Sequence, residues 1–177
     1  MEKHDKLSIR KIVAGIEKKR IPETKEILML HNVYIDRVAH ILASHSYITG
    51  WSTKDKKILM LKGKHEDSVA HILAYSSGET GWATKDKEIL MLQNKVGNSV
   101  AHYLAQNSER TGWITEDKEI LILQNKEGDS VAHELAYYHL TWTTSDPKIL
   151  LLVNKGRHTV KDVLIIRGKI KLNKEQK

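Results

Sequence analysis

The chain has 177 residues, of which 40% are hydrophobic, with no cysteine and a net charge of +7 at pH 7. Without cysteine it cannot form disulfides, thiolate metal sites or a thiol nucleophile. Its longest apolar runs, such as residues 120–123, are far shorter than the ~20 residues that a membrane span needs. The first residues lack the apolar segment of a secretory signal, so we expect a soluble, cytoplasmic protein.

The positive charge is concentrated at the two ends of the chain. Residues 1–21 hold seven Lys/Arg and three Asp/Glu (+4), residues 155–177 hold eight and two (+6), and the remainder holds 14 and 17 (−3). A nucleic-acid-binding surface is expected to place basic residues along one face or groove. This distribution favours polar end caps and tails, and binding of nucleic acid through the basic termini is the alternative.

The first predicted helix begins at Ser8, which can cap it, and places Ile12, Val13 and Ile16 on one face. A six-residue pattern ending in an apolar run then recurs five times, as in Lys87–Leu92. We predict helices of about two turns there, because each run follows a residue able to cap a helix. In the last copy a proline directly follows the capping residue, at the first helical position, where proline is preferred. These caps are Thr24, Asp55, Asp86, Asp117 and Asp146, with Thr53, Thr84, Thr115 and Thr144 as competing positions.

A second pattern, Ser-Val-Ala-His, alternates with these runs and sets a repeat of 31 residues. Its histidines stand at positions 40, 71, 102 and 133, and the copy before Val38 lacks the serine. A fixed period of this length is typical of stacked helical units. Gly97 and Gly128 precede two copies and offer the positive φ angle of a turn. Thr159 to Ile165 repeats the pattern without its histidine and predicts a C-terminal cap.

Together these patterns predict an all-α fold, a right-handed-type α-solenoid of stacked antiparallel αα-hairpin repeats, about five in number, with half-repeat caps. We expect eleven short helices in one domain over residues 1–168, with an N-terminal cap at 8–20, repeats at 21–156, a C-terminal cap at 157–168 and a basic tail at 169–177. Valine and leucine columns would form the core, at positions 38, 69, 100, 131 and 160 and at 42, 73, 104, 135 and 164, with a further leucine column at 28, 59, 90, 121 and 150. We expect a monomer.

The segment Gly128–Ala136 resembles the first helix of the ankyrin repeat, a divergent copy without the motif's proline. The resemblance covers three copies well and a fourth in part. It implies that His71, His102 and His133 bond the helix-opening Ser68, Ser99 and Ser130 and neighbouring backbone. The long hairpin between ankyrin repeats is reduced here to a few residues, although that hairpin and the first helix carry most ankyrin binding surfaces.

The histidine column does not predict chemistry. Histidines one repeat apart should lie ~10 Å from each other, whereas zinc needs nitrogens at ~2 Å. A serine that opens a helix is its cap, and no carboxylate recurs beside every Ser-x-x-His pair, so a hydrolase is the least favoured function. We expect no catalytic residues, no metal and no cofactor.

The leading prediction is a non-enzymatic, ankyrin-like scaffold that binds another protein. Positions that differ between repeats are the candidates for contact, since identical ones are committed to packing. We predict this surface at Tyr75, Tyr103, Arg110, Glu134, Tyr137, Tyr138 and His139. Tryptophans 51, 82, 113 and 142 precede the second helices and are expected to pack on their own repeats, and an exposed aromatic row is the alternative.

Overall fold

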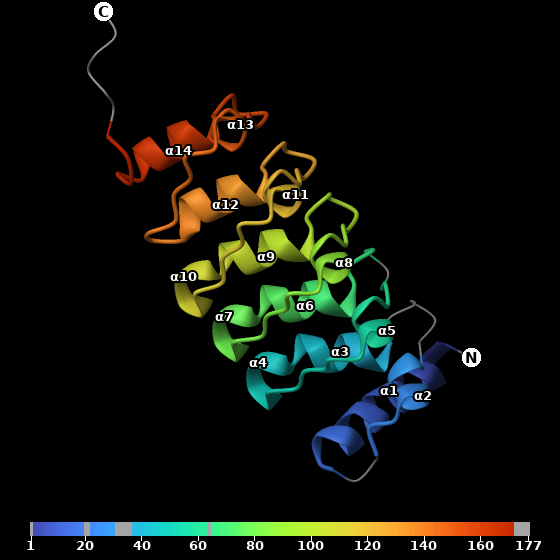
Figure 1. The fold of residues 1–177 in the computed structure, drawn as a ribbon. Coiled ribbons are helices and arrows are strands. Elements are labelled where there is room, and N and C mark those ends of the chain that lie inside the picture. Colours follow the sequence, from blue (N-terminus) through green and yellow to red (C-terminus); the bar gives the residue numbers. More distant parts are fainter. Residues whose placement is uncertain (1, 20–21, 31–36, 64, 172–177) are drawn as a thin grey trace, which may run out of the picture.

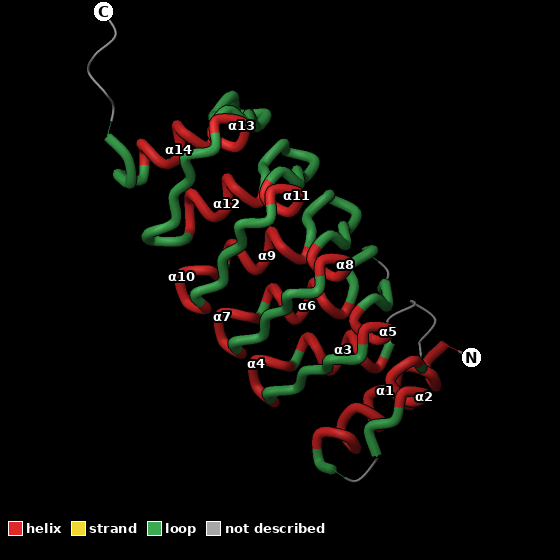
Figure 2. Tube along the Cα trace, viewed as in Figure 1, coloured by secondary structure: helices red, strands yellow, loops and turns green. Residues whose placement is uncertain are grey.

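Fourteen α-helices form a single stack in this computed structural model, which describes residues 2–19, 22–30, 37–63 and 65–171 (Figure 1). Figure 2 shows helices and loops in this part of the chain, with no strand. Among the described residues, no helix is both long and apolar enough to cross a membrane. The predicted all-α repeat solenoid is therefore confirmed.

Six helices lie side by side along the length of the stack, and each packs against the next (Figure 1). All but the first open with the Ser-Val-Ala-His pattern or a variant of it, and each of these five is seven or eight residues long. They are α1 (Glu2–Glu17), α3 (Val38–Ser44), α6 (Val69–Tyr75), α9 (Val100–Gln106), α12 (Val131–Tyr138) and α14 (Val160–Ile166).

Five further helices, formed by the apolar runs, are shorter than predicted. Each makes only about one turn: α2 (Lys25–Met29), α5 (Lys56–Leu59), α8 (Lys87–Leu90), α11 (Lys118–Leu121) and α13 (Pro147–Leu150). The aspartates and Thr24 cap them as predicted; the Asp86 carboxylate, for example, accepts from the Ile89 amide at 3.3 Å. The helices end early because the chain turns extended to pair with the start of the next repeat, where the Val100 amide donates to the Leu92 carbonyl at 3.1 Å.

The prediction of eleven helices missed three one-turn helices in the connections that lead back from the first row. These are α4 (Ser46–Thr49), α7 (Ser77–Thr80) and α10 (Ser108–Thr111). Each ends at a glycine in the left-handed region, such as Gly81 with φ +70°, whose amide donates to the Ser77 carbonyl at 2.7 Å. The corresponding connection after α12 is two residues shorter, and no helix lies between α12 and α13 there.

The core runs continuously through the stack. All five predicted valines are fully buried, and the leucines of the first-helix row are at most 1% exposed. The other leucine column is buried from Leu28 to Leu121, but Leu150 is half-buried because it lies in the last helix pair. The stack therefore has no separate centre, and each repeat depends on its neighbours for burial.

Among the described residues, one β-bridge closes each of the four turns that follow α5, α8, α11 and α13. The bridges join residues 62 with 68, 93 with 99, 124 with 130, and 153 with 159. Successive turns touch through backbone: the Lys155 amide donates to the Glu127 carbonyl at 2.9 Å. Gly128 has φ +79°, and a Cβ there would lie 3.0 Å from the Lys155 nitrogen, so glycine supplies both the turn and the close approach.

Charged side chains also link the repeats at the surface. The ammonium of Lys87, at the start of α8, lies 3.0 Å from the Asp117 cap of α11 and 2.9 Å from Glu119. Lys56 makes the same pair of contacts with Asp86 and Glu88 one repeat earlier. These groups are more than one-third exposed, so solvent screens each pair and each contributes little to stability.

The two ends differ from the prediction. The first helix begins at Glu2, so Ser8 lies inside it and is not its cap. At the other end, the Lys169 side chain reaches the carbonyls of Leu135, Ala136 and His139, and so caps α12; the described part of the predicted tail is therefore docked at its start. The boundary predicted between residues 20 and 21, and tail residues 172–177, lie outside the described residues.

Candidate protein-binding surface

The three Ser-x-x-His motifs form the bonds that the ankyrin resemblance implies. In the central copy, the Ser99 hydroxyl lies 2.7 Å from His102 Nδ1, and the Ser99 amide donates to the same nitrogen at 3.0 Å. His102 Nε2 lies 3.0 Å from the Asp129 carbonyl of the next repeat. His71 and His133 make the same contacts, to the carbonyls of Asn98 and His158. Each histidine therefore fastens its own helix start to the following turn.

These bonds fix the state of the histidine rings. Because a backbone N–H donates to Nδ1, that nitrogen is an acceptor, and the proton of the neutral ring sits on Nε2, facing a carbonyl. Burial lowers the pKa of all three histidines, and that of His102 falls to about 4. The rings are neutral at pH 7, which suits a structural fastener.

The four tryptophans pack against the repeats. Trp113 and Trp142 are buried, while Trp51 and Trp82 are half-buried and pack against the core. The Trp51 indole N–H also donates to Glu23 at 2.8 Å. A fully exposed aromatic ladder is therefore absent among these four described residues.

Five of the seven predicted contact residues lie along the exposed side of α6, α9 and α12, which we call the first-helix face. They are Tyr75, Tyr103, Glu134, Tyr137 and Tyr138. Tyr75 is 69% exposed and meets the edge of Tyr103, with ring centroids 5.9 Å apart. Tyr137 and Tyr138 form a second edge-to-face pair at 4.8 Å. The first pair joins two successive repeats, and the second pair lies on the first helix of the next repeat.

The other two predicted residues have local partners. Arg110 lies on α10 and pairs with Glu79 of α7 at 2.8 Å, both of them exposed. His139 shapes the turn after α12, where its Nδ1 accepts the amides of Thr141 and Trp142. His139 is therefore committed to the turn, whereas the Arg110 pair remains at the surface beside the first-helix face.

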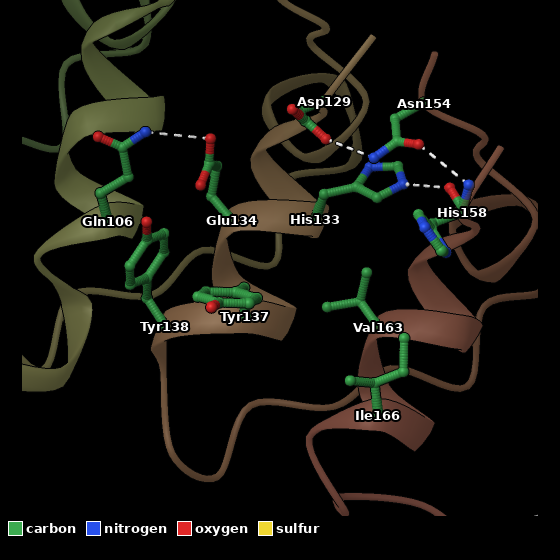
Figure 3. A pocket seen from close by; sticks show the side chains of 10 residues that line it. All are labelled: Gln106, Asp129, His133, Glu134, Tyr137, Tyr138, Asn154, His158, Val163 and Ile166. Carbon is green, nitrogen blue, oxygen red and sulfur yellow. Dashed lines mark hydrogen bonds between the residues drawn. The ribbon is translucent and has the colours of Figure 1, made fainter. Parts of the chain in front are cut away.

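Two hollows mark this face. The first, of about 430 Å³, lies between α9, α12 and α14 (Figure 3). Glu134, Tyr137 and Tyr138 of α12 line it together with Val163 and Ile166 of α14, while Asp129 and His158 lie at its rim of turns. The second hollow, of about 420 Å³, includes Tyr47, Tyr75 and Glu79. Gln106 lines both, so the hollows adjoin along the face.

Glu134 is the most perturbed acid on the face. It is half-buried, and burial raises the pKa of its carboxyl to about 7, with a smaller contribution from the negative charge of Asp129. The Gln106 amide donates to Glu134 Oε1 at 3.0 Å, which opposes that rise. Near neutral pH this carboxyl exists in both protonation states, so a partner can select one of them.

Sequence reasoning missed the polar ladder that supports this face. The Asn154 amide donates to Asp129 at 2.7 Å, and Asn125 and Asn94 make the same bond to Asn98 and Asp67. The signal was present, because an Asn, Asp or His precedes each capping Ser or Thr at a fixed place in the repeat. Gln106 was missed because only the stacking of α9 on α12 brings it to Glu134.

The described residues hold no group of three or more His, Cys, Asp or Glu side chains placed to bind a metal ion. In the three Ser-x-x-His pairs, the serine hydroxyl lies beside the histidine ring as part of the helix cap. Both residues of each pair are fully or nearly fully buried. A buried hydroxyl that also accepts the histidine's backbone amide is not exposed to a substrate. The arrangement therefore offers a surface for contact, and its histidines act in folding.

Comparison with known proteins gives structural neighbours only, since no family model and no curated protein matches the chain. A chain from the complex of the predatory endopeptidase Bd0816 of Bdellovibrio bacteriovorus with immunity protein Bd3460 is similar, with a TM-score of 0.50 and 16% identity, covering 89% of this chain and 91% of that chain. The Swi6 ankyrin-repeat fragment from S. cerevisiae is also similar, with a TM-score of 0.48, 13% identity and coverage of 88% and 86%. By the repeat geometry described above, this chain is a divergent ankyrin-like helical repeat protein in its fold.

Proposed function

We propose that this protein is a non-enzymatic scaffold that binds another protein through its first-helix face. The observation that carries the proposal is the gathering of three tyrosines of this face, Tyr75, Tyr137 and Tyr138, and the half-buried acid Glu134 around two adjoining hollows. Tyrosine gives a large contact area with little loss of side-chain freedom and is enriched at protein interfaces. The residues that are identical between repeats are used in packing, whereas the variable Tyr75, Tyr137 and Tyr138 are exposed and available for recognition.

The rigid stack supports the same proposal. A row of first helices joined by buried histidine bonds holds side chains from different repeats at fixed spacing, so little ordering cost remains when a partner binds. One structurally similar chain belongs to a complex of an endopeptidase with an immunity protein, and a protein partner is in line with that assembly. We further propose one repeat domain over residues 1–168 and a monomeric scaffold, which sedimentation would test.

The experiment compares partner capture by matched surface variants. Immobilised protein is used to capture binders from lysate of the source cell, and each captured protein is then purified and titrated by calorimetry. Tyr75→Ala with Tyr137→Ala should weaken binding at least tenfold, because buried interface tyrosines each contribute about 2 kcal/mol. The control is Leu151→Ala, a side chain that is 66% exposed just after α13. Equal affinity of the tyrosine variant and the wild type would contradict the proposed face.

The alternative function, binding of nucleic acid through the basic ends, has a separate test. Contacts to phosphate give an affinity that falls steeply as salt rises. Random DNA and RNA are therefore titrated at two salt concentrations. Tight binding at low salt with a steep loss would favour the alternative, whereas no binding at low salt would remove it.

A further inference from the structure

We propose that the hollow between α9, α12 and α14 receives an arginine side chain of the partner protein. This inference rests on the proposed scaffold function and names the chemistry of the contact. We call the hollow the acidic pocket and define it by Glu134, Asp129, Gln106, Tyr137, Tyr138 and Val163 (Figure 3). Its volume of about 430 Å³ lies within the range of sites that enclose a small ligand.

Two carboxyl side chains, Asp129 and Glu134, line the pocket without a cationic partner among the residues that line it. Among the described residues, the Gln106 amide is the donor to the Glu134 carboxyl, and it bonds Oε1. Asp129 Oδ1 accepts the Asn154 amide, and no described lysine or arginine forms an ion pair with either acid or lines the pocket. A cation with several N–H donors would supply what these oxygens lack.

The walls of the pocket fit the rest of an arginine side chain. Tyr137 and Tyr138 present aromatic rings, and Val163 and Ile166 of α14 present aliphatic groups toward them (Figure 3). The chain already shows this chemistry, since the guanidinium of Arg167 lies over the Tyr137 ring at 4.8 Å from its centroid. Apolar walls bury the methylene stem, while a planar guanidinium stacks on tyrosine and bonds a carboxylate in a way that lysine does not.

The acid is particular to one repeat. The residue after the histidine is Ile41, Ile72 and Tyr103 in the other copies, so packing of the solenoid does not need a carboxylate at this place. Glu134 is half-buried without a cationic partner, and burial raises the pKa of its carboxyl because the charged form is disfavoured there. A residue of this kind is expected where a partner compensates the charge.

The test uses the full chain and a small probe. N-acetyl-arginine amide is titrated into isotopically labelled protein and followed by NMR, with N-acetyl-citrulline amide as the neutral probe of the same shape. We expect saturable shifts confined to α12, α14 and Gln106, and at least tenfold weaker binding of citrulline. Glu134→Gln should weaken arginine binding at least tenfold, because a charge-assisted bond is lost. The control Glu109→Gln, on an exposed acid of α10, should stay within twofold.

Several outcomes would overturn the inference. Equal binding of citrulline, shifts centred elsewhere, or unchanged arginine binding by Glu134→Gln would each contradict it. Thermal unfolding of both variants checks their folding, and the loss of a half-buried charge should leave Glu134→Gln at least as stable as wild type. If the protein forms a concentration-dependent dimer that Glu134→Gln abolishes, the occupant of the pocket is a second copy of this chain, and the proposal of a different partner protein is overturned. If the protein captures a partner but N-acetyl-arginine amide does not bind to it, only the arginine pocket is refuted. If N-acetyl-arginine amide binds but no partner protein is captured, the scaffold function is refuted.

Discussion

Acid should destabilise this protein through its histidine column, and His102 gives the clearest case. Its ring is 0% exposed, its Nδ1 accepts the Ser99 amide at 3.0 Å, and its Nε2–H faces the Asp129 carbonyl. A proton added to Nδ1 would point at the Ser99 N–H donor and place a charge in the core. This geometry agrees with the fall in the pKa of His102 to about 4, for which burial is the main cause.

The size and direction of the effect follow from the two pKa values. The pKa of His102 is 6.5 in its ordinary state and about 4 when folded, so the unfolded chain takes up a proton first. The stabilising contribution is complete above pH 6.5 and is lost as the pH falls from 6.5 toward 4. At about 1.4 kcal/mol per pKa unit, the loss approaches about 3 kcal/mol. His71 and His133 are lowered in the same direction and add to it.

The assay is urea unfolding followed by circular dichroism at pH 7.5 and pH 4.5. Glu134 titrates in the opposite sense, so Glu134→Gln serves as the background for every protein compared. At pH 7.5, His102→Ala should cost about 3 kcal/mol or more, because the Ser99 amide and Asp129 carbonyl each lose a buried partner. Between pH 7.5 and pH 4.5, the free energy of unfolding should fall less in the His102→Ala protein than in the Glu134→Gln background, by up to about 3 kcal/mol. An equal pH-dependent loss in both proteins would refute the reasoning.

Three further predictions concern stability. Glu134→Gln should stabilise the protein at pH 8 by up to about 3 kcal/mol, since a raised carboxyl pKa lowers stability as pH rises from 4.5 through about 7; urea midpoints at pH 5 and 8 measure it. Gly128→Ala should cost more than Gly112→Ala in thermal unfolding: both have positive φ, worth about 1–2 kcal/mol, but only at Gly128 would the new Cβ meet neighbouring backbone. Leu104→Ala should cost about 2–5 kcal/mol in urea unfolding, because Leu104 is fully buried; a loss below 1 kcal/mol would contradict the continuous core.

The sequence by itself determined the repeat, its helical class and its core. A 31-residue period leaves the same apolar columns in every copy, and caps such as Asp86 and Ser99 mark the helix starts through local bonds. The caps depend on residues within a few positions of each other, and the core columns recur at the same place in each 31-residue copy, so both can be read from the sequence. The fastening role of the histidines followed from the family resemblance, and the bonds to Ser99 and Asp129 agree with it.

Only the tertiary structure decided where helices end and how the surface is assembled. The helices of the apolar runs end after one turn because the next repeat's turn pairs with the chain there, and Lys169 caps α12 across about thirty residues of sequence. The acidic pocket also needs three helices, since Gln106, Glu134 and Val163 come from α9, α12 and α14. Such contacts depend on how one repeat stacks on another, and the physical reason is that burial and hydrogen bonding across repeats outweigh local preference in these short helices.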